Sequence, residues 1–332
     1  MGRHVTPEHP RVEESDDDAM TSDPKYLWLN GRLVPWNEAQ VHATRLGWST
    51  IGAVFEGIKA YWNDEHGELY GLQFAEHYRR FLDSMRFQGM TPRWSVDDLV
   101  EASVSLLREN GIRSDSYVRP MAYFGDTTWF STGAESETHC FIWTAPFRSA
   151  LGTGATLRAC VSSWTRLSDT MMPPRIKCLS NYQNSRMALM EARRHGYDSP
   201  ILLNDRGKVT EGPASCVFIV RDGVAITPAL TSGILESITR RTLLALCRDE
   251  LGIEVAEREV DRSELYVADE IFFCGTGAEV QAVGEIDGYR VKDGRAGPLT
   301  ARVERAFHDL VRGRSAHEHH RIAVYGSRVA AR

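Results

Sequence analysis

The stretch that decides the interpretation of this chain is residues 174–182, which read PRIKCLSNY. A single lysine, Lys177, follows a Pro-Pro turn, and a short linker joins it to Tyr182 at the head of a helical pattern. A lone lysine in such a place is most often an ordinary surface charge. Three distant features favour a chemical role instead: Glu211 in a Gly-flanked turn, the loop 235–240, and the glycine-rich segment 275–278.

Length, composition and charge limit the class of protein. The chain has 332 residues, which suits two domains of ordinary size. Its 42% hydrophobic and 25% charged residues are typical of a globular protein, and a formal charge of −6 argues against a general nucleic-acid binder. No apolar run approaches the ~20 residues of a membrane span, and the N-terminus lacks an apolar signal core. We therefore expect a cytoplasmic protein without a membrane or nucleic-acid partner.

The cysteines and histidines do not predict a metal site. Six cysteines are scattered without a C-x-x-C pair or a histidine at zinc spacing, as expected for buried thiols in a reducing compartment. His317, His319 and His320 could bind a metal, but a solvated terminal segment is the commoner explanation of such a tail.

Apolar spacing predicts the elements and the fold class. Helices are expected over 74–87, 95–110, 182–194, 238–251, 263–267 and 299–311, and strands over 53–61, 117–123, 140–143, 201–203, 216–220 and 270–274. Because these mix without a regular βαβ alternation, we expect an α+β fold. The expected organisation is a disordered segment 1–24, a small α+β domain 25–146, a linker 147–154, a large domain 155–312 and a tail 313–332.

Together the singled-out residues can meet the needs of pyridoxal phosphate. That cofactor requires a lysine for its aldehyde, an anion at its ring nitrogen, donors for its phosphate and a donor to its ring oxygen. Lys177 and Glu211 answer the first two, although Glu211 is equally well explained as a solvated turn carboxylate. Residues 237–239 open a helix whose free N–H groups suit a phosphate, with a plain serine N-cap as the alternative. Segment 275–277 could form an anion nest, and Arg80 a fixed charge, although a helix-flank arginine is usually solvated.

In this order the motifs resemble one family closely, the branched-chain aminotransferases, over about residues 26–311. These belong to the fold-type IV pyridoxal-phosphate enzymes (the class-IV aminotransferase superfamily), with the D-amino-acid aminotransferases and aminodeoxychorismate lyases. The matching segments are VFEGIKAY (54–61), HYRRF (77–81), SSWTR (162–166), EARRHGYD (191–198) and LYVADE (265–270). The resemblance implies a two-domain, D-amino-acid aminotransferase-like fold with the cofactor at the domain interface. It also implies a homodimer whose active sites borrow a loop from the partner subunit.

The resemblance implies a role for each matching position. Lys177 would hold pyridoxal phosphate as the Schiff-base lysine and then shuttle the proton between the substrate Cα and C4′ of the cofactor. Tyr182 would hydrogen-bond the ring oxygen, Glu211 would pair with the ring nitrogen, and Leu235 would pack on the ring face. The phosphate would be held by Arg80, Ile238, Thr239 and Thr276. The substrate side would be formed by Phe55, Tyr117, Arg119, Thr50, Ala150 and Gly277.

Several positions depart from the family pattern. Thr50 and Ala150 stand where the family usually has tyrosines, which removes bulk and hydrogen-bonding reach from a pocket wall unless Trp129 or Phe130 refills the space. Ser237 replaces a glycine, and Ser215-Cys216 replace a Glu-Asn pair. The substrate is therefore left open between a branched-chain L-amino acid and a related, non-standard one.

The leading interpretation is an aminotransferase that moves an amino group between an L-amino acid and a 2-oxo acid such as 2-oxoglutarate, with ping-pong kinetics. Two alternatives stay open. One is a lyase of the aminodeoxychorismate lyase type, against which the segment 55–57 and Arg119 count. The other is a non-catalytic relative used for binding or assembly, against which Lys177, Glu211 and Arg80 count.

Overall fold

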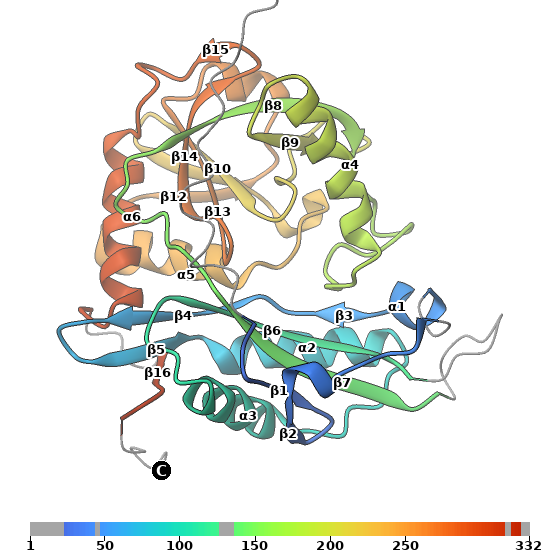
Figure 1. Ribbon diagram of the computed structural model, residues 1–332. Helices are drawn as coiled ribbons and strands as arrows, with labels where there is room; N and C mark the ends of the chain where they lie inside the picture. Colours follow the sequence, from blue (N-terminus) through green and yellow to red (C-terminus); the bar gives the residue numbers. More distant parts are fainter. Residues whose placement is uncertain (1–22, 44–46, 126–135, 316–319, 327–332) are drawn as a thin grey trace, which may run out of the picture.

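Two eight-stranded sheets make up the computed structural model, which describes residues 23–43, 47–125, 136–315 and 320–326 (Figure 1). The first sheet has the order β16-β5-β4-β6-β7-β1-β2, and β3 also pairs with β6. All its pairs are antiparallel. Its strands are β1 (Tyr26–Leu29), β2 (Arg32–Pro35), β3 (Val54–Phe55), β4 (Ile58–Asn63), β5 (Glu68–Leu72), β6 (Ser116–Phe124), β7 (Thr138–Pro146) and β16 (Arg321–Ala323).

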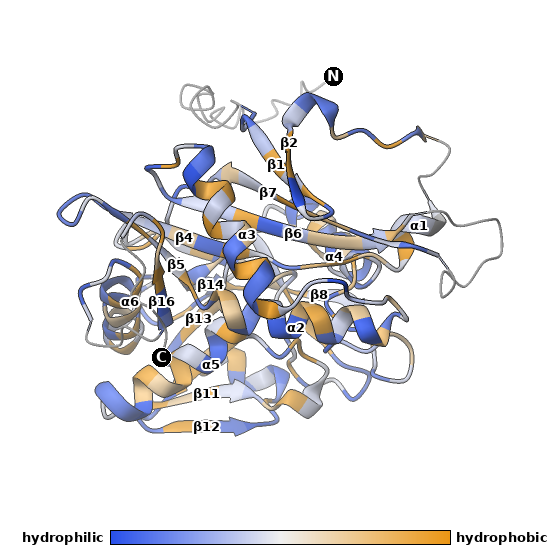
Figure 2. Cartoon of the chain, turned by 90° about the horizontal axis from the view of Figure 1, so that it is seen from below, coloured by the Kyte–Doolittle hydropathy of each residue, from blue (hydrophilic) through white to orange (hydrophobic). Residues whose placement is uncertain are grey.

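Two amphipathic helices cover one face of the first sheet, α2 (Phe74–Phe87) and α3 (Val96–Glu109). Hydrophobic stripes run along both (Figure 2). In α2 the predicted stripe is buried at Phe74, Tyr78 and Phe81, inside the core of this sheet. In α3 the predicted cap is present, because Ser95 and Asp98 exchange hydrogen bonds with each other's backbone N–H. Both helices therefore follow the sequence-based prediction, within one residue at the ends of α3.

The second sheet is mixed and has the order β12-β11-β10-β13-β14-β8-β9, with β15 on β14. The β8–β9, β8–β14 and β11–β12 pairs are parallel. Its strands are β8 (Thr156–Thr165), β9 (Ser199–Leu203), β10 (Cys216–Arg221), β11 (Val224–Pro228), β12 (Val255–Arg258), β13 (Glu270–Gly275), β14 (Glu279–Ile286) and β15 (Tyr289–Arg290). Its main helices are α4 (Asn181–Arg194), α5 (Ile238–Ala245) and α6 (Pro298–Val311).

The core of the second sheet has two parts. Helices α5 and α6 pack on one of them, where Leu243, Val303 and Phe307 meet Phe218 and Phe272. Tyr61 and Leu72, which come from β4 and β5 of the first sheet, belong to the same cluster. The two sheets therefore share an apolar interface. The domain boundaries predicted from the sequence stay a proposal.

Three predicted elements differ from the structure. The strand expected over 53–61 is two strands, β3 and β4, because the chain breaks at Glu56 and Gly57, where the Glu56 side chain is buried. The helix expected over 238–251 is α5 followed by a π-helical turn, Leu246–Glu250, and residues 262–266 form a 3-10 helix. Finally, part of the tail is ordered against the first sheet: β16 pairs with β5, and Val324 is buried in the first core.

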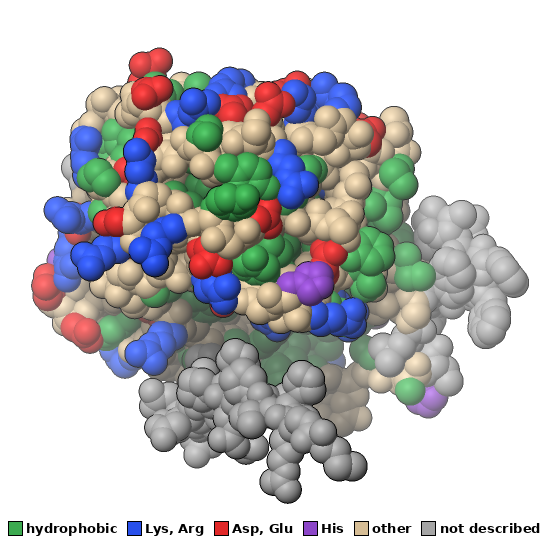
Figure 3. Space-filling view, turned by 90° about the horizontal axis from the view of Figure 1, so that it is seen from above, with side chains coloured by type: hydrophobic (Ala, Val, Ile, Leu, Met, Phe, Trp, Pro, Cys, Tyr) green, Lys and Arg blue, Asp and Glu red, His purple; other side chains and the backbone are tan. Residues whose placement is uncertain are grey.

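Side chains of both charges lie on the face of the molecule seen from above (Figure 3). Among the coloured, described residues of that face, basic and acidic side chains are intermingled with hydrophobic ones. Within the described part of the chain, no helix is long and apolar enough to cross a membrane.

Candidate active site

A cavity of about 620 Å³ is lined by residues from both sheets, a size typical of small-molecule sites. Sequence positions more than two hundred residues apart meet there. The predicted site residues on its wall are Phe55, Arg80, Tyr117, Arg119, Lys177, Tyr182, Glu211, Leu235, Ile238, Thr276 and Gly277. Three predicted residues, Thr50, Ala150 and Thr239, are not among the lining residues.

Lys177 is fixed at the junction of the two sheets. Its carbonyl accepts the Phe55 N–H at 3.1 Å, and its own N–H donates to Ser84 Oγ at 3.2 Å. Its ammonium donates to the Tyr182 hydroxyl at 2.6 Å. Burial alone would lower the pKa of Lys177, but Tyr182 and Glu56 outweigh it and the pKa lies above its ordinary value. The amine therefore needs a neighbouring acceptor for its proton before it can act as a nucleophile.

Glu211 is a buried carboxylate, not a solvated one. One carboxylate oxygen lies 2.7 Å from the Arg166 guanidinium, and the other accepts the Leu235 N–H at 3.1 Å. The turn that follows closes with the Gly212 N–H donating to the Ser215 carbonyl at 2.7 Å. A carboxylate buried against an arginine and held by a tight turn is a rigid anion, as a protonated ring nitrogen requires.

Arg166 is a site residue to which the sequence-based reasoning gave no role, although it closes the SSWTR motif. It lines the cavity, and its Nε and Nη1 atoms are buried without a hydrogen-bond partner in the described residues. The Arg166–Glu211 ion pair joins the residue that follows β8 to the turn that precedes β10. Only the motif itself could have signalled the residue, because nothing in the spacing links positions 166 and 211.

The N-terminus of α5 faces the same cavity through Ser237 and Ile238. The Ser237 hydroxyl accepts the Arg240 N–H at 3.2 Å, so it acts as the N-cap. The N–H groups of the first helical turn have no partner within a helix, and together with the helix dipole they suit an anion. Thr239 is buried in this turn away from the cavity wall.

Arg80 is held by a buried carboxylate, Glu56, and is not solvated. Its Nε and Nη2 each donate to Glu56 at 2.7 Å, and its Nη1 donates to the Glu236 carbonyl at 2.7 Å, next to the α5 N-terminus. His77 adds a third contact to Glu56 at 2.8 Å, and burial lowers the pKa of His77, so the neutral ring is the donor. Although burial raises the pKa of Glu56, Arg80 and His77 outweigh that effect and hold it well below its usual range.

Another part of the cavity wall is formed by Phe55, Tyr117 and Arg119. The Arg119 guanidinium lies 5.0 Å from the centre of the Phe55 ring, and its Nε has no hydrogen-bond partner in the described residues. A Cβ added at Gly57 would lie 1.7 Å from the Tyr117 hydroxyl, so a residue without a side chain is required there. This wall combines aromatic surface with one cation.

Thr50 and Ala150 do not reach this wall. Thr50 lies in α1 (Trp48–Ile51), where its hydroxyl donates to the Gly47 carbonyl at 2.8 Å. Ala150 donates its N–H to Glu279 at 2.7 Å and borders a different, smaller cavity. Neither residue lines the cavity of this chain, so their place on the substrate side stays a prediction. Trp129 and Phe130, which were expected to refill the space, lie outside the described residues.

The residues present fit pyridoxal phosphate. The lysine, the buried carboxylate and the helix N-terminus line one cavity, and each offers the group that one part of the cofactor needs. Among the described residues, no group of three or more His, Cys, Asp or Glu is placed to hold a metal ion.

Comparison with known proteins agrees with this geometry. The family model of amino-transferase class IV matches residues 53–286. A probable branched-chain-amino-acid aminotransferase of Aquifex aeolicus is 41% identical over 289 residues, which are 87% of this chain and 93% of that protein. The structure of a branched-chain amino acid aminotransferase from Thermobaculum terrenum in its PLP form is 46% identical, with a TM-score of 0.89 over 91% of this chain and 99% of that one.

A second solved structure extends the likeness to an enzyme with an amino acid. The branched-chain aminotransferase from Thermoproteus uzoniensis with norvaline is 39% identical, with a TM-score of 0.85 over 91% of this chain and 100% of that one. The match of the family model over most of the folded chain, with the lysine, carboxylate and helix N-terminus gathered in one cavity, shows that this chain belongs to the class IV aminotransferases and is a transaminase that uses pyridoxal phosphate.

Proposed function

We propose that this transaminase moves an amino group between a branched-chain or related hydrophobic L-amino acid and a 2-oxo acid such as 2-oxoglutarate. The observation that carries the proposal is the wall made by Phe55, Tyr117 and Arg119. Its aromatic surface suits an apolar side chain, and its cation suits the second carboxylate of a dicarboxylic acceptor. The names of the similar enzymes, and the apolar norvaline found with one of them, support the hydrophobic amino donor.

Each residue of the cavity would have a distinct task. Bound pyridoxal phosphate supplies an electron sink for the substrate Cα. Lys177 would hold the cofactor and then, as a free amine, move a proton to and from the substrate Cα. Tyr182, whose hydroxyl lies 2.6 Å from the Lys177 amine, would hydrogen-bond the ring oxygen of the cofactor. The Glu211 carboxylate, held in place by Arg166, would keep the ring nitrogen protonated, and the N-terminus of α5 with Arg80 would anchor the phosphate. Two half-reactions on one site give a ping-pong mechanism.

A half-reaction screen tests the substrate class. The purified holoenzyme is mixed with one amino donor at a time, and the absorbance change of the cofactor is followed. The donors are branched-chain L-amino acids, glutamate, aromatic amino acids and bulky amines. Branched-chain amino acids and glutamate are expected to react fastest. Reaction only with aromatic amino acids or bulky amines would overturn the proposed substrate class.

Two further assays separate this function from its alternative. A lyase would release pyruvate from its substrate without a 2-oxo acid acceptor, whereas the proposed enzyme needs the acceptor for every turnover. Lys177→Ala is expected to lose both the lysine-bound chromophore and turnover. A Lys177→Ala protein that stays yellow and active would refute the role given to this residue.

We also propose a cytoplasmic homodimer, as the family resemblance implies. All six cysteines are free and buried, which suits a reducing compartment. Light scattering of the purified protein measures the oligomeric state directly, and a mass equal to one chain would contradict the dimer.

A further inference from the structure

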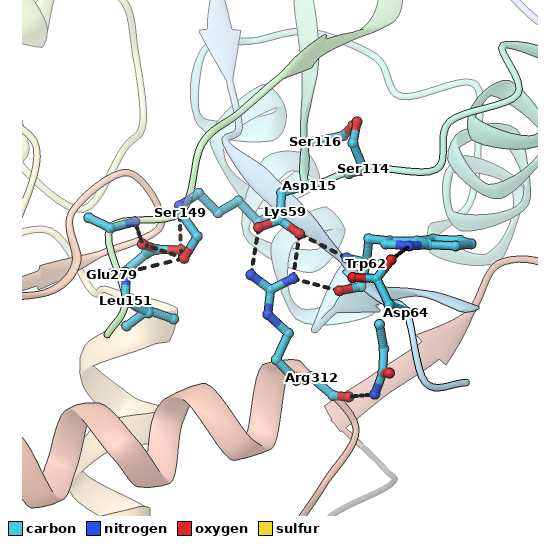
Figure 4. Close-up of polar contacts among 12 residues, drawn as sticks. Lys59, Trp62, Asp64, Ser114, Asp115, Ser116, Ser149, Leu151, Glu279 and Arg312 are labelled. Carbon is cyan, nitrogen blue, oxygen red and sulfur yellow. Dashed lines mark hydrogen bonds and ion pairs between the residues drawn. The ribbon is translucent and has the colours of Figure 1, made fainter. Parts of the chain in front are cut away.

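A buried ion pair links the two sheets outside the cavity (Figure 4). Lys59 lies on β4, Glu279 opens β14, and Lys59 Nζ is 2.8 Å from Glu279 Oε1. The side chains are 2% and 0% exposed. Removing two charges from water costs about as much as their attraction returns, so such a pair is weak evidence for stability. Neither residue lines the active-site cavity, and the mechanism above uses neither.

Glu279 connects the interdomain linker to the turn that carries Thr276 and Gly277. Its carboxylate accepts the Ser149 hydroxyl at 2.9 and 3.0 Å and the Ala150 N–H at 2.7 Å. Its backbone has φ +54°, a left-handed conformation that a residue with a side chain adopts only when its surroundings impose it. Because Glu279 pairs with Gly275 across that turn, its contacts fix the turn's end.

Lys59 connects the same carboxylate to the substrate wall. Its ammonium lies 3.4 Å from the centre of the Phe147 ring. Phe147 stacks on Tyr117, with ring centres 6.0 Å apart and an interplanar angle of 27°. Lys59 and Tyr117 are also direct partners on neighbouring strands. One chain of contacts therefore runs from the Thr276–Gly277 turn through Glu279, Lys59 and Phe147 to Tyr117.

We propose that Lys59 and Glu279 are a positioning pair that sets the separation between Tyr117 and the Thr276–Gly277 turn, and thereby the size of substrate the cavity accepts. This inference rests on the proposed function only for the identity of that substrate. The pair touches neither Lys177 nor Glu211, so it acts on substrate binding and leaves the chemical step and the cofactor in place.

Lys59 carries its charge near neutral pH. Burial lowers the pKa of Lys59 to about 8, against the raising effects of Glu279 and Asp115. Other charged or titratable groups around the pair are Arg312 and His308 from the end of α6 and Tyr61 from β4. Loss of the Lys59 charge, which lies against the Phe147 ring, should therefore be felt at Tyr117.

Three variants test the proposal by steady-state kinetics with a branched-chain amino acid. Lys59→Met and Glu279→Gln are expected to raise KM about tenfold, equivalent to ~1.4 kcal/mol of lost binding, with kcat within about twofold of wild type. Lys59→Arg keeps the charge and the cation–π contact, so it is expected to restore most of the affinity. If Lys59→Met fails to fold, Glu279→Gln and Lys59→Arg still give the comparison.

The matched control is Arg312→Met. Arg312 and Asp115 also join α6 to the first sheet, with contacts of 2.6 and 2.7 Å (Figure 4), but Arg312 reaches neither Glu279 nor the Phe147 ring. This variant is expected to lower the melting temperature without changing KM. An equal rise of KM in Arg312→Met would reduce the effect to general loosening of the interface and overturn the proposal.

A second measurement does not depend on turnover. Hydrogen exchange of the cofactor-free protein reports the amides of residues 147–151 and 275–279, and Lys59→Met and Glu279→Gln are expected to exchange at least about tenfold faster in both segments. Unchanged exchange together with unchanged KM would overturn the positioning role. If the wild-type enzyme rejects every branched-chain amino acid, the proposed substrate fails, while the exchange data still decide whether the pair holds the two segments.

Discussion

Glu56→Gln is the sharpest test of how the phosphate end of the site is built. Glu56 is fully buried and accepts three hydrogen bonds, two from Arg80 and one from His77. A glutamine of the same shape keeps one acceptor oxygen, places an NH₂ group against a donor, and leaves the Arg80 charge without its counter-ion. Removing one partner of a buried pair costs about 3–5 kcal/mol, and we expect a loss within that range.

The pH dependence gives a second signature of the same residue. The folded-state pKa of Glu56 lies well below its ordinary value of 4.5. Its stabilising contribution is therefore fully present above pH ~4.5 and is lost as the pH falls towards the folded-state pKa. Below pH ~4.5 the wild-type free energy of unfolding should fall with decreasing pH more steeply than that of Glu56→Gln, which has no proton to bind there.

The assay is denaturant unfolding of the cofactor-free protein at several pH values, followed by tryptophan fluorescence, since Trp28 and Trp94 pack together in the first core. Glu76→Gln is the matched control: it makes the same chemical change on α2, where Glu76 pairs with the largely exposed Arg79, and little effect is expected. If Glu56→Gln unfolds at the wild-type midpoint and with the wild-type pH dependence, the buried pair does not hold Arg80 in the way described.

Three other changes have defined outcomes. Gly57→Ala should displace Tyr117, because the added Cβ would lie 1.7 Å from the Tyr117 hydroxyl, and KM for the amino acid should rise. Adding Tyr117→Phe to Gly57→Ala should relieve only part of the clash, since the ring Cζ would still lie 2.6 Å from that Cβ. A Gly57→Ala enzyme with wild-type KM would contradict that contact. Arg166→Met leaves the buried Glu211 without its cation, so we expect thermal denaturation of the cofactor-free protein to show a free energy of unfolding lower by ~3–5 kcal/mol. Arg166→Lys should be intermediate, and equal stability of both variants and the wild type would contradict the expectation. Val324→Ala should cost ~2 kcal/mol in denaturant unfolding because the side chain is fully buried in the first core, and no loss would mean that the strand at 321–323 does not hold it there.

The parts of the fold that sequence reasoning predicted well are those set by local pattern. The stripe of α2 and the Ser95 cap of α3 depend on residues three or four apart, so spacing alone locates them. The lysine, the carboxylate and the helix start were likewise visible as motifs. They predicted a binding site only in combination, because a single cofactor requires all three groups.

The parts that sequence reasoning missed depend on pairing between distant positions. Nothing in the local pattern shows that Glu56 would turn inward to Arg80 and interrupt the expected strand, or that Arg166 would meet Glu211. The local pattern also does not show the hydrogen bonds of Thr50 to Gly47 and of Ala150 to Glu279. A tail rich in polar residues also gave no sign that Val324 would be buried.

The short strand β16 makes the first sheet discontinuous in sequence. Residues 26–146 supply seven of its strands, and the eighth comes only after the whole second sheet has been made. During synthesis the edge of β5 therefore stays unpaired until residues 321–323 emerge, so the first sheet is completed only after the second. The part of the chain that forms the second sheet is therefore an insertion into the part that forms the first sheet. It is joined to the first part at both ends, after β7 and after α6. Two connections restrict how far the two parts can separate, so the cavity lined by both sheets is expected to open by a small shear motion and not by a wide hinge motion.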